Sequence, residues 1–143
     1  MNKYNDLEIT ILSCLLQKPE LMKEVILQNE HFIKHKKIWM FMKSFYEKFG
    51  NFDLSLMMSI CKNQYRMGEY IAWLLNQEPA PNLFKQYEKQ LIDLYNESKK
   101  DKWIIEKVYE LANKLFVRNI TIADFKNEVE NIYSKADEIF EEV

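Results

Sequence analysis

The sequence predicts an all-α protein, with a compact helical-bundle head followed by a C-terminal antiparallel helical hairpin. Only two glycines and three prolines interrupt a chain of 143 residues that is rich in helix-forming Leu, Lys and Glu. No alternating run of β-branched residues indicates a strand. Near the C-terminus, an apolar heptad pattern indicates a long helix that another helix must cover. Its members are spaced by three and four residues in turn: Ile122, Phe125, Val129, Ile132, Ala136, Ile139 and Val143.

The first part of the head is expected to form three helices. Apolar residues at helical spacing predict the first helix over 6–17. Pro19 suits the first turn of a second helix, which should end near Asn29. A third helix is expected over 35–49, and Gly50 is placed to close it in a left-handed conformation.

Three further helices are expected in the rest of the head. Asp53 is a plausible N-cap for the fourth, which should bury Met57 and Cys61. A short fifth helix follows Gly68 and belongs in the middle of a core, because it is apolar nearly all round. Asn82 is placed to cap the sixth helix, after the longest loop of the chain.

A polar segment separates the head from the hairpin. Residues 96–102 are polar on every side, so the head is expected over 1–98 and the hairpin over 99–143. The sequence leaves open whether a helix continues through this segment. Residues 118–120 should turn the chain, and Thr121 with Asp124 should cap the last helix.

The last helix is expected to extend beyond the arm it packs against. It measures roughly 32 Å, whereas an arm over 101–117 measures only about 24 Å at the helical rise. The apolar end, from Ala136 to Val143, should therefore meet the head, a second subunit or further chain. Apolar residues outside the seam make a second surface, and a hairpin with two such faces should dimerise. The residues expected at the subunit or partner interface are Trp103, Val108, Leu111, Phe116, Phe125, Val129, Ile132 and Tyr133.

Composition excludes several classes of function. The net charge of −2 lacks the basic excess of domains that grip many phosphates. Two glycines are too few for a phosphate-binding or dinucleotide-binding loop, so no cofactor is expected. No stretch approaches a membrane span of about 20 apolar residues, and the N-terminus is not a signal peptide. Cys14 and Cys61 fit free thiols in a reducing compartment, so we expect a cytoplasmic protein.

No catalytic or metal site is predicted. His31 and His35 have a spacing that could place two ligands on one helix face, but no third ligand is near and the intervening residues should break the helix. The carboxylates do not converge as a catalytic pair requires; caps and surface charges explain them better. A solvated face likewise explains the lysines better than a nucleic-acid site does. These residues are Glu8, Asp53, Glu69, and Lys34, Lys36, Lys37, Lys99, Lys100 and Lys102.

An ordered set of short motifs resembles the N-terminal domain of bacterial and phage replicative DNA helicases of the DnaB type. Glu8 stands before an apolar run that ends in two leucines and Pro19, as in the family. The set departs from the family in a shorter loop before His35, in a single glycine at Gly68, and in the position of Asn82. The other matching residues are Phe32, Ile38, Trp39, Phe52, Asp53, Tyr70, Leu74, Tyr87, Leu91 and 136–140.

The resemblance implies a structural collar without catalysis, in which the end of the 99–143 hairpin is the start of a linker to a motor domain absent from this chain. In this family the domain pairs through its hairpin, three pairs form a ring on the hexameric motor, and the ring binds primase and helps to admit the loader. It implies a self-associating chain, as a dimer or a trimer of dimers, that docks primase or loader and binds neither membrane nor a specific nucleic-acid sequence.

Three alternatives remain open at this point. The chain could be a stand-alone phage-type adaptor or inhibitor that binds a host helicase or primase. A close variant is the helicase-binding tail of primase, which has a similar shape but would follow a catalytic domain. From another class, a helical metal-dependent hydrolase would rest only on His31, His35 and the carboxylates.

Overall fold

Every regular element is helical in the residues that the computed structural model describes, which are 3–63 and 65–140, so the all-α prediction is confirmed. The chain divides into two compact units, Met1–Ile92 and Asp93–Val143, here called the head and the hairpin. This division falls six residues before the boundary expected from the polar segment. The expected last member of the heptad, Val143, lies outside the described residues.

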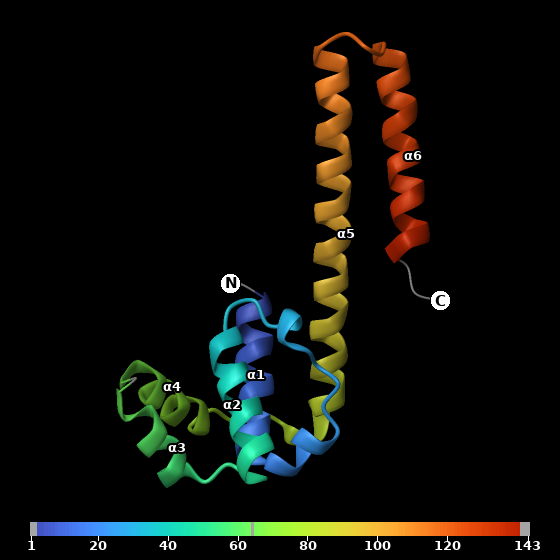
Figure 1. Ribbon diagram of the computed structural model, residues 1–143. Coiled ribbons are helices and arrows are strands. Elements are labelled where there is room, and N and C mark those ends of the chain that lie inside the picture. Colours follow the sequence, from blue (N-terminus) through green and yellow to red (C-terminus); the bar gives the residue numbers. More distant parts are fainter. Residues whose placement is uncertain (1–2, 64, 141–143) are drawn as a thin grey trace. The chain divides into compact units, whose positions relative to one another are not determined.

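The head contains four α-helices and the beginning of a fifth, joined by short 3-10 turns (Figure 1). The α-helices are α1 (Lys3–Gln17), α2 (Lys36–Phe49), α3 (Leu54–Ile60), α4 (Tyr65–Leu75) and the start of α5 (Phe84–Phe116). The 3-10 turns are Pro19–Lys23, Asn29–His31, Cys61–Asn63 and Pro81–Leu83. One continuous core fills the head, and α1 supplies its centre with a fully buried face. Its largest side chains include Trp39, Phe32, Phe84, Ile11, Leu12, Leu15 and Leu91.

The predicted ends of α2 and α3 are confirmed. Gly50 has φ 73°, the left-handed conformation that glycine adopts without strain, and its N–H bonds to the carbonyl of Tyr46. The Asp53 side chain accepts the N–H of Leu56 at 2.9 Å, as an N-cap should.

Several other sequence predictions are wrong. Asn82 lies inside the 3-10 turn Pro81–Leu83 and does not cap a helix. Gly68 lies within α4 and does not precede it, and a Cβ there would come 3.4 Å from the sulfur of Met58 in α3. The expectation that α4 is buried all round is also wrong, because Trp73 is 45% exposed.

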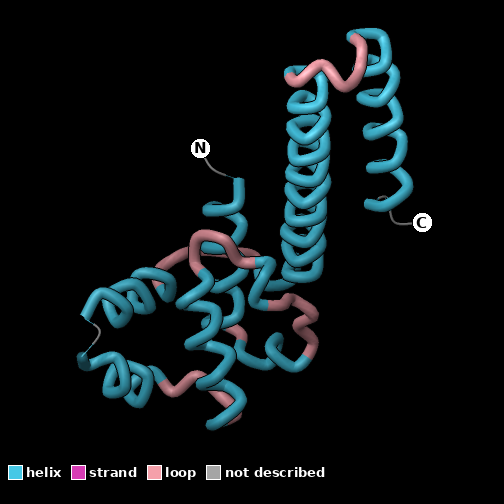
Figure 2. Tube along the Cα trace, turned by 45° about the horizontal axis from the view of Figure 1, so that its top comes forward, coloured by secondary structure: helices cyan, strands magenta, loops and turns pink. Residues whose placement is uncertain are grey.

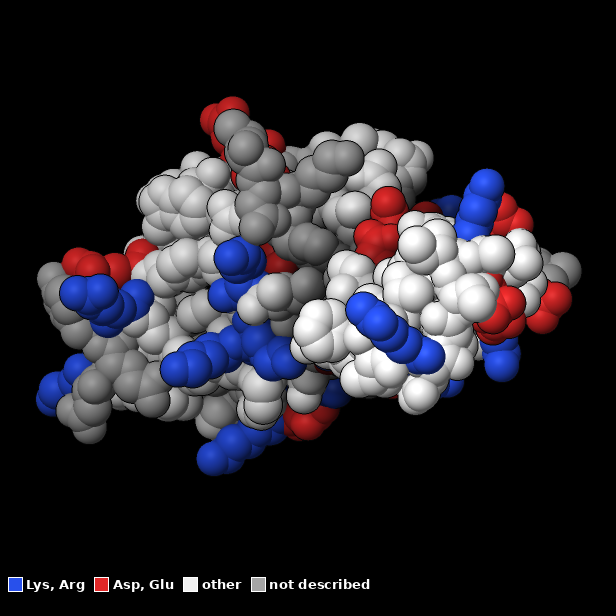
Figure 3. Space-filling model, turned by 90° about the horizontal axis from the view of Figure 1, so that it is seen from above, with Lys and Arg blue, Asp and Glu red and all other residues white. Residues whose placement is uncertain are grey.

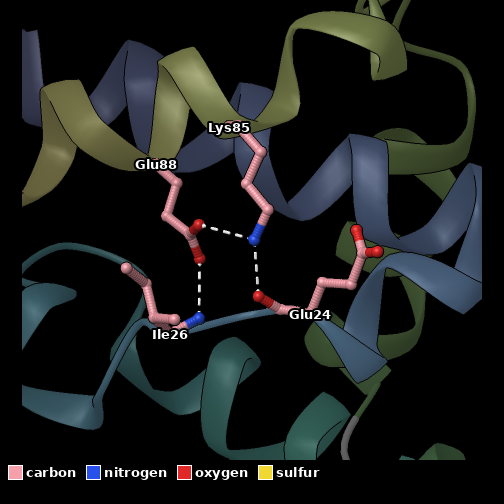
Figure 4. Close-up of polar contacts among 4 residues, drawn as sticks. All are labelled: Glu24, Ile26, Lys85 and Glu88. Atoms are coloured by element: carbon pink, nitrogen blue, oxygen red, sulfur yellow. Dashed lines mark hydrogen bonds and ion pairs between the residues drawn. The ribbon is translucent and has the colours of Figure 1, made fainter.

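The helix predicted from Pro19 to Asn29 ends after one 3-10 turn, because side chains of α5 bond to the backbone beyond it (Figure 4). The carboxylate of Glu88, which is only 1% exposed, accepts the N–H of Ile26 at 2.8 Å. The ammonium group of Lys85 donates to the carbonyl of Glu24 and pairs with Glu88 at 3.2 Å. These contacts satisfy backbone groups that a helix would otherwise use, so the chain runs extended along the start of α5.

A buried carboxylate holds the loop that leads into α2. Glu8 of α1 is 0% exposed, and its two oxygens accept the backbone N–H groups of Ile33, Lys34 and His35 at 3.2, 3.1 and 2.8 Å. A buried anion is tolerated when several amides point at it, and the positive end of the α2 dipole adds to the stabilisation. Glu8 therefore fixes the start of α2 against α1.

We expect Glu8→Gln to destabilise the head by about 3 kcal/mol, because a neutral amide weakens three charge-assisted bonds and presents its own donor to the loop. Urea unfolding followed by circular dichroism measures the change. Glu20→Gln, which alters an exposed glutamate in the same unit, is the matched control and should cost less than about 0.5 kcal/mol. Equal stabilities of the two variants would contradict the assigned role.

The hairpin consists of the second part of α5 and of α6 (Ile122–Phe140), which runs back alongside it (Figure 2). The polar segment 96–102 is helical, so α5 continues without a break for 33 residues. Arg118 turns the chain with φ 62°, as expected for the turn over 118–120. The predicted capping box is confirmed: Thr121 Oγ1 accepts the N–H of Asp124 at 3.1 Å, and the carboxylate of Asp124 accepts the N–H of Thr121 at 3.4 Å.

The predicted overhang of α6 is wrong for Ala136 and Phe140, because the continuous α5 reaches past the assumed start of the arm. Lys100 of α5 pairs with Asp137 of α6 at 2.6 Å. The rings of Trp103 and Phe140 meet edge to face with centroids 6.1 Å apart. Ala136 is fully buried. In this part of α6, α5 of the same chain therefore covers Ala136 and Phe140, whereas Ile139 is 51% exposed.

Candidate interaction surfaces

The hairpin seam takes up most of the residues predicted for an interface. Val108, Phe125, Val129 and Ile132 are half-buried, and Leu111 is 7% exposed. Trp103 is also half-buried and packs against Phe140. These six residues line the junction of α5 and α6, so they first of all hold the hairpin together. The remaining two, Phe116 and Tyr133, are exposed.

A second apolar stripe runs along α5 on a face that the hairpin does not cover. Ile105, Tyr109, Ala112 and Phe116 follow one another at i, i+4, i+7 and i+11, and all are exposed. At 100° per residue the stripe lies about 100° around α5 from the seam. Its spacing is that of a helix-pairing surface. The sequence analysis included Phe116 among the expected interface residues but missed Ile105, although the spacing was sufficient to find it.

The turn of the hairpin adds further exposed apolar surface. Phe116, Val117 and Ile122 flank residues 118–121 and are 87%, 61% and 76% exposed. Ile122 belongs to the predicted heptad, but the chain offers it no cover at this end of α6. Several large apolar side chains that are exposed close together usually mark a site of contact with another protein.

An open groove of about 400 Å³ lies between α5 and α6. Trp103, Leu111 and Ile132 contribute its apolar part, and charged side chains of both signs surround them. The charged lining residues are Lys107, Glu110, Lys114, Glu128 and Lys135. Mixed charge around a narrow apolar strip suits contact with another helix better than binding of a small charged ligand.

In the head, His35 joins three helices through hydrogen bonds. Its Nε2 lies 2.7 Å from Oδ1 of Asn5 in α1, and its Nδ1 lies 2.7 Å from the hydroxyl of Tyr70 in α4. A neutral ring fits both contacts, with Nε2 donating to Asn5 and Nδ1 accepting from Tyr70. Burial lowers the pKa of His35, with a smaller opposing effect from Glu8 and a further lowering by Lys34. Burial likewise raises the pKa of Tyr70 to about 12.

The two histidines serve separate structural roles. Nδ1 of His31 accepts the N–H of Gln28 at 2.8 Å, and His35 contacts Asn5 and Tyr70 instead. Within the described ranges, no three His, Cys, Asp or Glu residues are arranged to hold a metal ion. Burial raises the pKa of Cys14 to about 11, which keeps this buried thiol protonated and unreactive.

A family comparison assigns the head. The family model of the DnaB-like helicase N terminal domain matches residues 1–93, about two thirds of the chain. The chain belongs to this family. The matched residues correspond to the head, which is thus a DnaB-like N-terminal domain, the non-catalytic domain type of this family. Neither the curated proteins nor the solved structures that were compared gave a match. None of the helices in the described part of this DnaB-like chain is long and apolar enough to cross a membrane.

We expect the stability of the head to fall as the pH drops below the ordinary histidine pKa of 6.5, because the unfolded chain then binds a proton that folded His35 resists. Above that pH both states are neutral and the full contribution is present. The loss continues down to the lowered pKa of the folded state, with a slope of at most about 1.4 kcal/mol per pH unit.

Urea unfolding of wild type and His35→Gln, from about pH 7 to about pH 5, isolates this effect as a difference between the two proteins. The glutamine variant should lose less stability on acidification. The carboxylates change the stability of the two proteins equally, so the difference between them reports His35. Parallel pH profiles would contradict the assigned state of His35.

Proposed function

We propose that this DnaB-like domain is the collar through which a replicative DNA helicase assembles in the cytoplasm, and to which primase or the helicase loader docks. The single observation that carries the proposal is the family match over residues 1–93. The exposed apolar stripe of α5 supports self-association, because a hairpin of two helices leaves such a face without cover.

In this proposal the two faces of the hairpin have different roles. The seam residues Val108, Leu111, Phe125, Val129 and Ile132 shape the hairpin and hold α6 against α5. The second apolar stripe of α5, here called the outer stripe, ends at Phe116 and meets a second copy of the chain. Tyr133 of α6 completes the contact at its edge, whereas Trp103 lines the groove between α5 and α6 and packs against Phe140. A dimer, or three dimers in a ring, would use the same surface, and a two-fold contact is the simplest way for one stripe to cover another.

We expect Tyr109→Glu to weaken self-association roughly 100-fold, since it places a charge at the centre of the buried stripe. Tyr109 is 69% exposed in the single chain, so the substitution should leave the helix content unchanged. Sedimentation equilibrium over a range of concentrations measures the dissociation constant.

Asn127→Glu is the matched control for this experiment. It also introduces one negative charge at an exposed position of the hairpin, but on the side of α6 away from Ile122 and Tyr133. It should associate like the wild type. A wild type that stays monomeric at high concentration, or a Tyr109 variant that associates as tightly as the control, would contradict the assembly proposal.

A stand-alone adaptor that captures a host helicase or primase would use the same fold and the same apolar face. Co-purification distinguishes the two: a collar associates with its own copies and with the cognate primase or loader, whereas an adaptor binds a helicase encoded elsewhere. No described feature favours the helical hydrolase.

A further inference from the structure

The head carries a basic groove that the assembly proposal does not use. It has a volume of about 500 Å³ and lies where the 33–35 loop enters α2, beside α4. Its apolar members are Ile33, Ile38 and Met67, together with the ring of Tyr70. Its cationic members are Lys34, Lys36, Lys37 and Arg66. No Asp or Glu is found among the described residues that line it.

The net negative charge of the whole chain does not reflect the charge of the head, where this groove lies. The first 92 residues contain 12 basic and 10 acidic side chains, whereas the remaining 51 contain 8 and 12. The head is therefore cationic, and Figure 3 shows a group of Lys and Arg side chains on this part of it. Within the described part of the chain, no ion pair engages Lys34, Lys36, Lys37 or Arg66.

The placement of the lysines opposes the stability of α2. Acidic residues are favoured in the first turn of a helix, where the dipole is positive, but α2 has none there and begins with two lysines. Lys34 adds a third cation just before the helix. The carboxylate of Glu8, which lies against this loop, is fully buried, and its oxygens already accept three amides. The four cations line the groove and are exposed to solvent, so a ligand that enters it can pair with them.

We propose that this groove binds an acidic, amphipathic peptide segment of another protein. Carboxylates of the segment would pair with Lys34, Lys37 and Arg66 at the rim, and an apolar side chain would contact Ile33, Met67 and Tyr70. An apolar floor within a basic rim complements this type of ligand. Single-stranded nucleic acid fits less well, because four cations around a short groove give no extended track and the half-exposed Tyr70 ring is held by His35. This inference deepens the proposed docking role and rests on it only in supposing a protein partner.

Fluorescence anisotropy of the full chain tests the inference with three labelled probes. They are a short peptide of glutamates interspersed with leucine and phenylalanine, the same peptide with glutamine in place of glutamate, and oligothymidylate. The glutamate peptide should bind, and its affinity should fall as salt is added. The glutamine peptide should bind at least roughly tenfold more weakly.

The double variant Lys34→Glu/Lys37→Glu should bind the glutamate peptide roughly tenfold more weakly than wild type. Lys23→Glu, at an exposed lysine of the head outside the groove, is the control and should bind like wild type. Arg66→Glu on α4 gives a second, independent variant, and circular dichroism confirms that each variant is folded. Equal binding by groove variants and control would overturn the inference, as would a preference for oligothymidylate or for the glutamine peptide. Sedimentation of the same variants separates this result from the assembly proposal, because groove variants should still self-associate.

Discussion

The buried carboxylate of Glu8 is the interaction on which the arrangement of the head depends. It comes from the middle of α1 and binds three consecutive amides of the loop before α2. Because the same loop supplies Lys34 and His35, this one side chain sets both the rim of the basic groove and the position of the His35 ring. The hydrogen bond from Tyr70 to His35 then ties α4 to the same point. A feature with no catalytic purpose thus determines which groups the head presents to solvent.

The hairpin is governed by a different constraint, which is geometric. Each of two paired helices can cover only one face of the other, and apolar residues outside that face stay in water until another chain arrives. In α5 the seam is occupied by residues such as Leu111, whereas Tyr109 and Phe116 lie a quarter of the way around the helix. The same helix that holds the hairpin together thus carries a second apolar face that α6 leaves exposed.

Local signals predicted the local structure well. The sequence identified the helix caps at Gly50, Asp53, and Thr121 with Asp124. Such caps can be predicted because each one bonds to a backbone group no more than four residues away. The spacing of the apolar residues was likewise sufficient to predict helices α2 and α6. The continuous α5 was left open because its polar segment lacks an apolar face, yet it also lacks any glycine or proline that would end a helix.

The features that sequence reasoning missed involve residues far apart in the chain. The predicted helix over 19–29 fails because Glu88 bonds to Ile26, 62 residues away. Glu8 was treated as an ordinary cap or surface charge, since its partners lie 25 to 27 residues later. Lys34, Lys36 and Lys37 were interpreted as a solvated face. The rest of the basic groove comes from Arg66 and Met67 of α4, and the sequence does not indicate that α4 lies beside the start of α2. Hydrophobic spacing carries no information about such pairings.

Amide hydrogen exchange at low and high protein concentration tests most directly whether a second copy covers the outer stripe. Backbone amides that are helical but exposed open readily, and burial against a neighbour slows their exchange. Peptides from 105–116 should exchange more slowly at high concentration, while the loop over 33–35 should be protected equally at both concentrations because Glu8 holds it within each chain. Exchange over 105–116 that is independent of concentration would contradict the assignment of this stripe as the assembly surface.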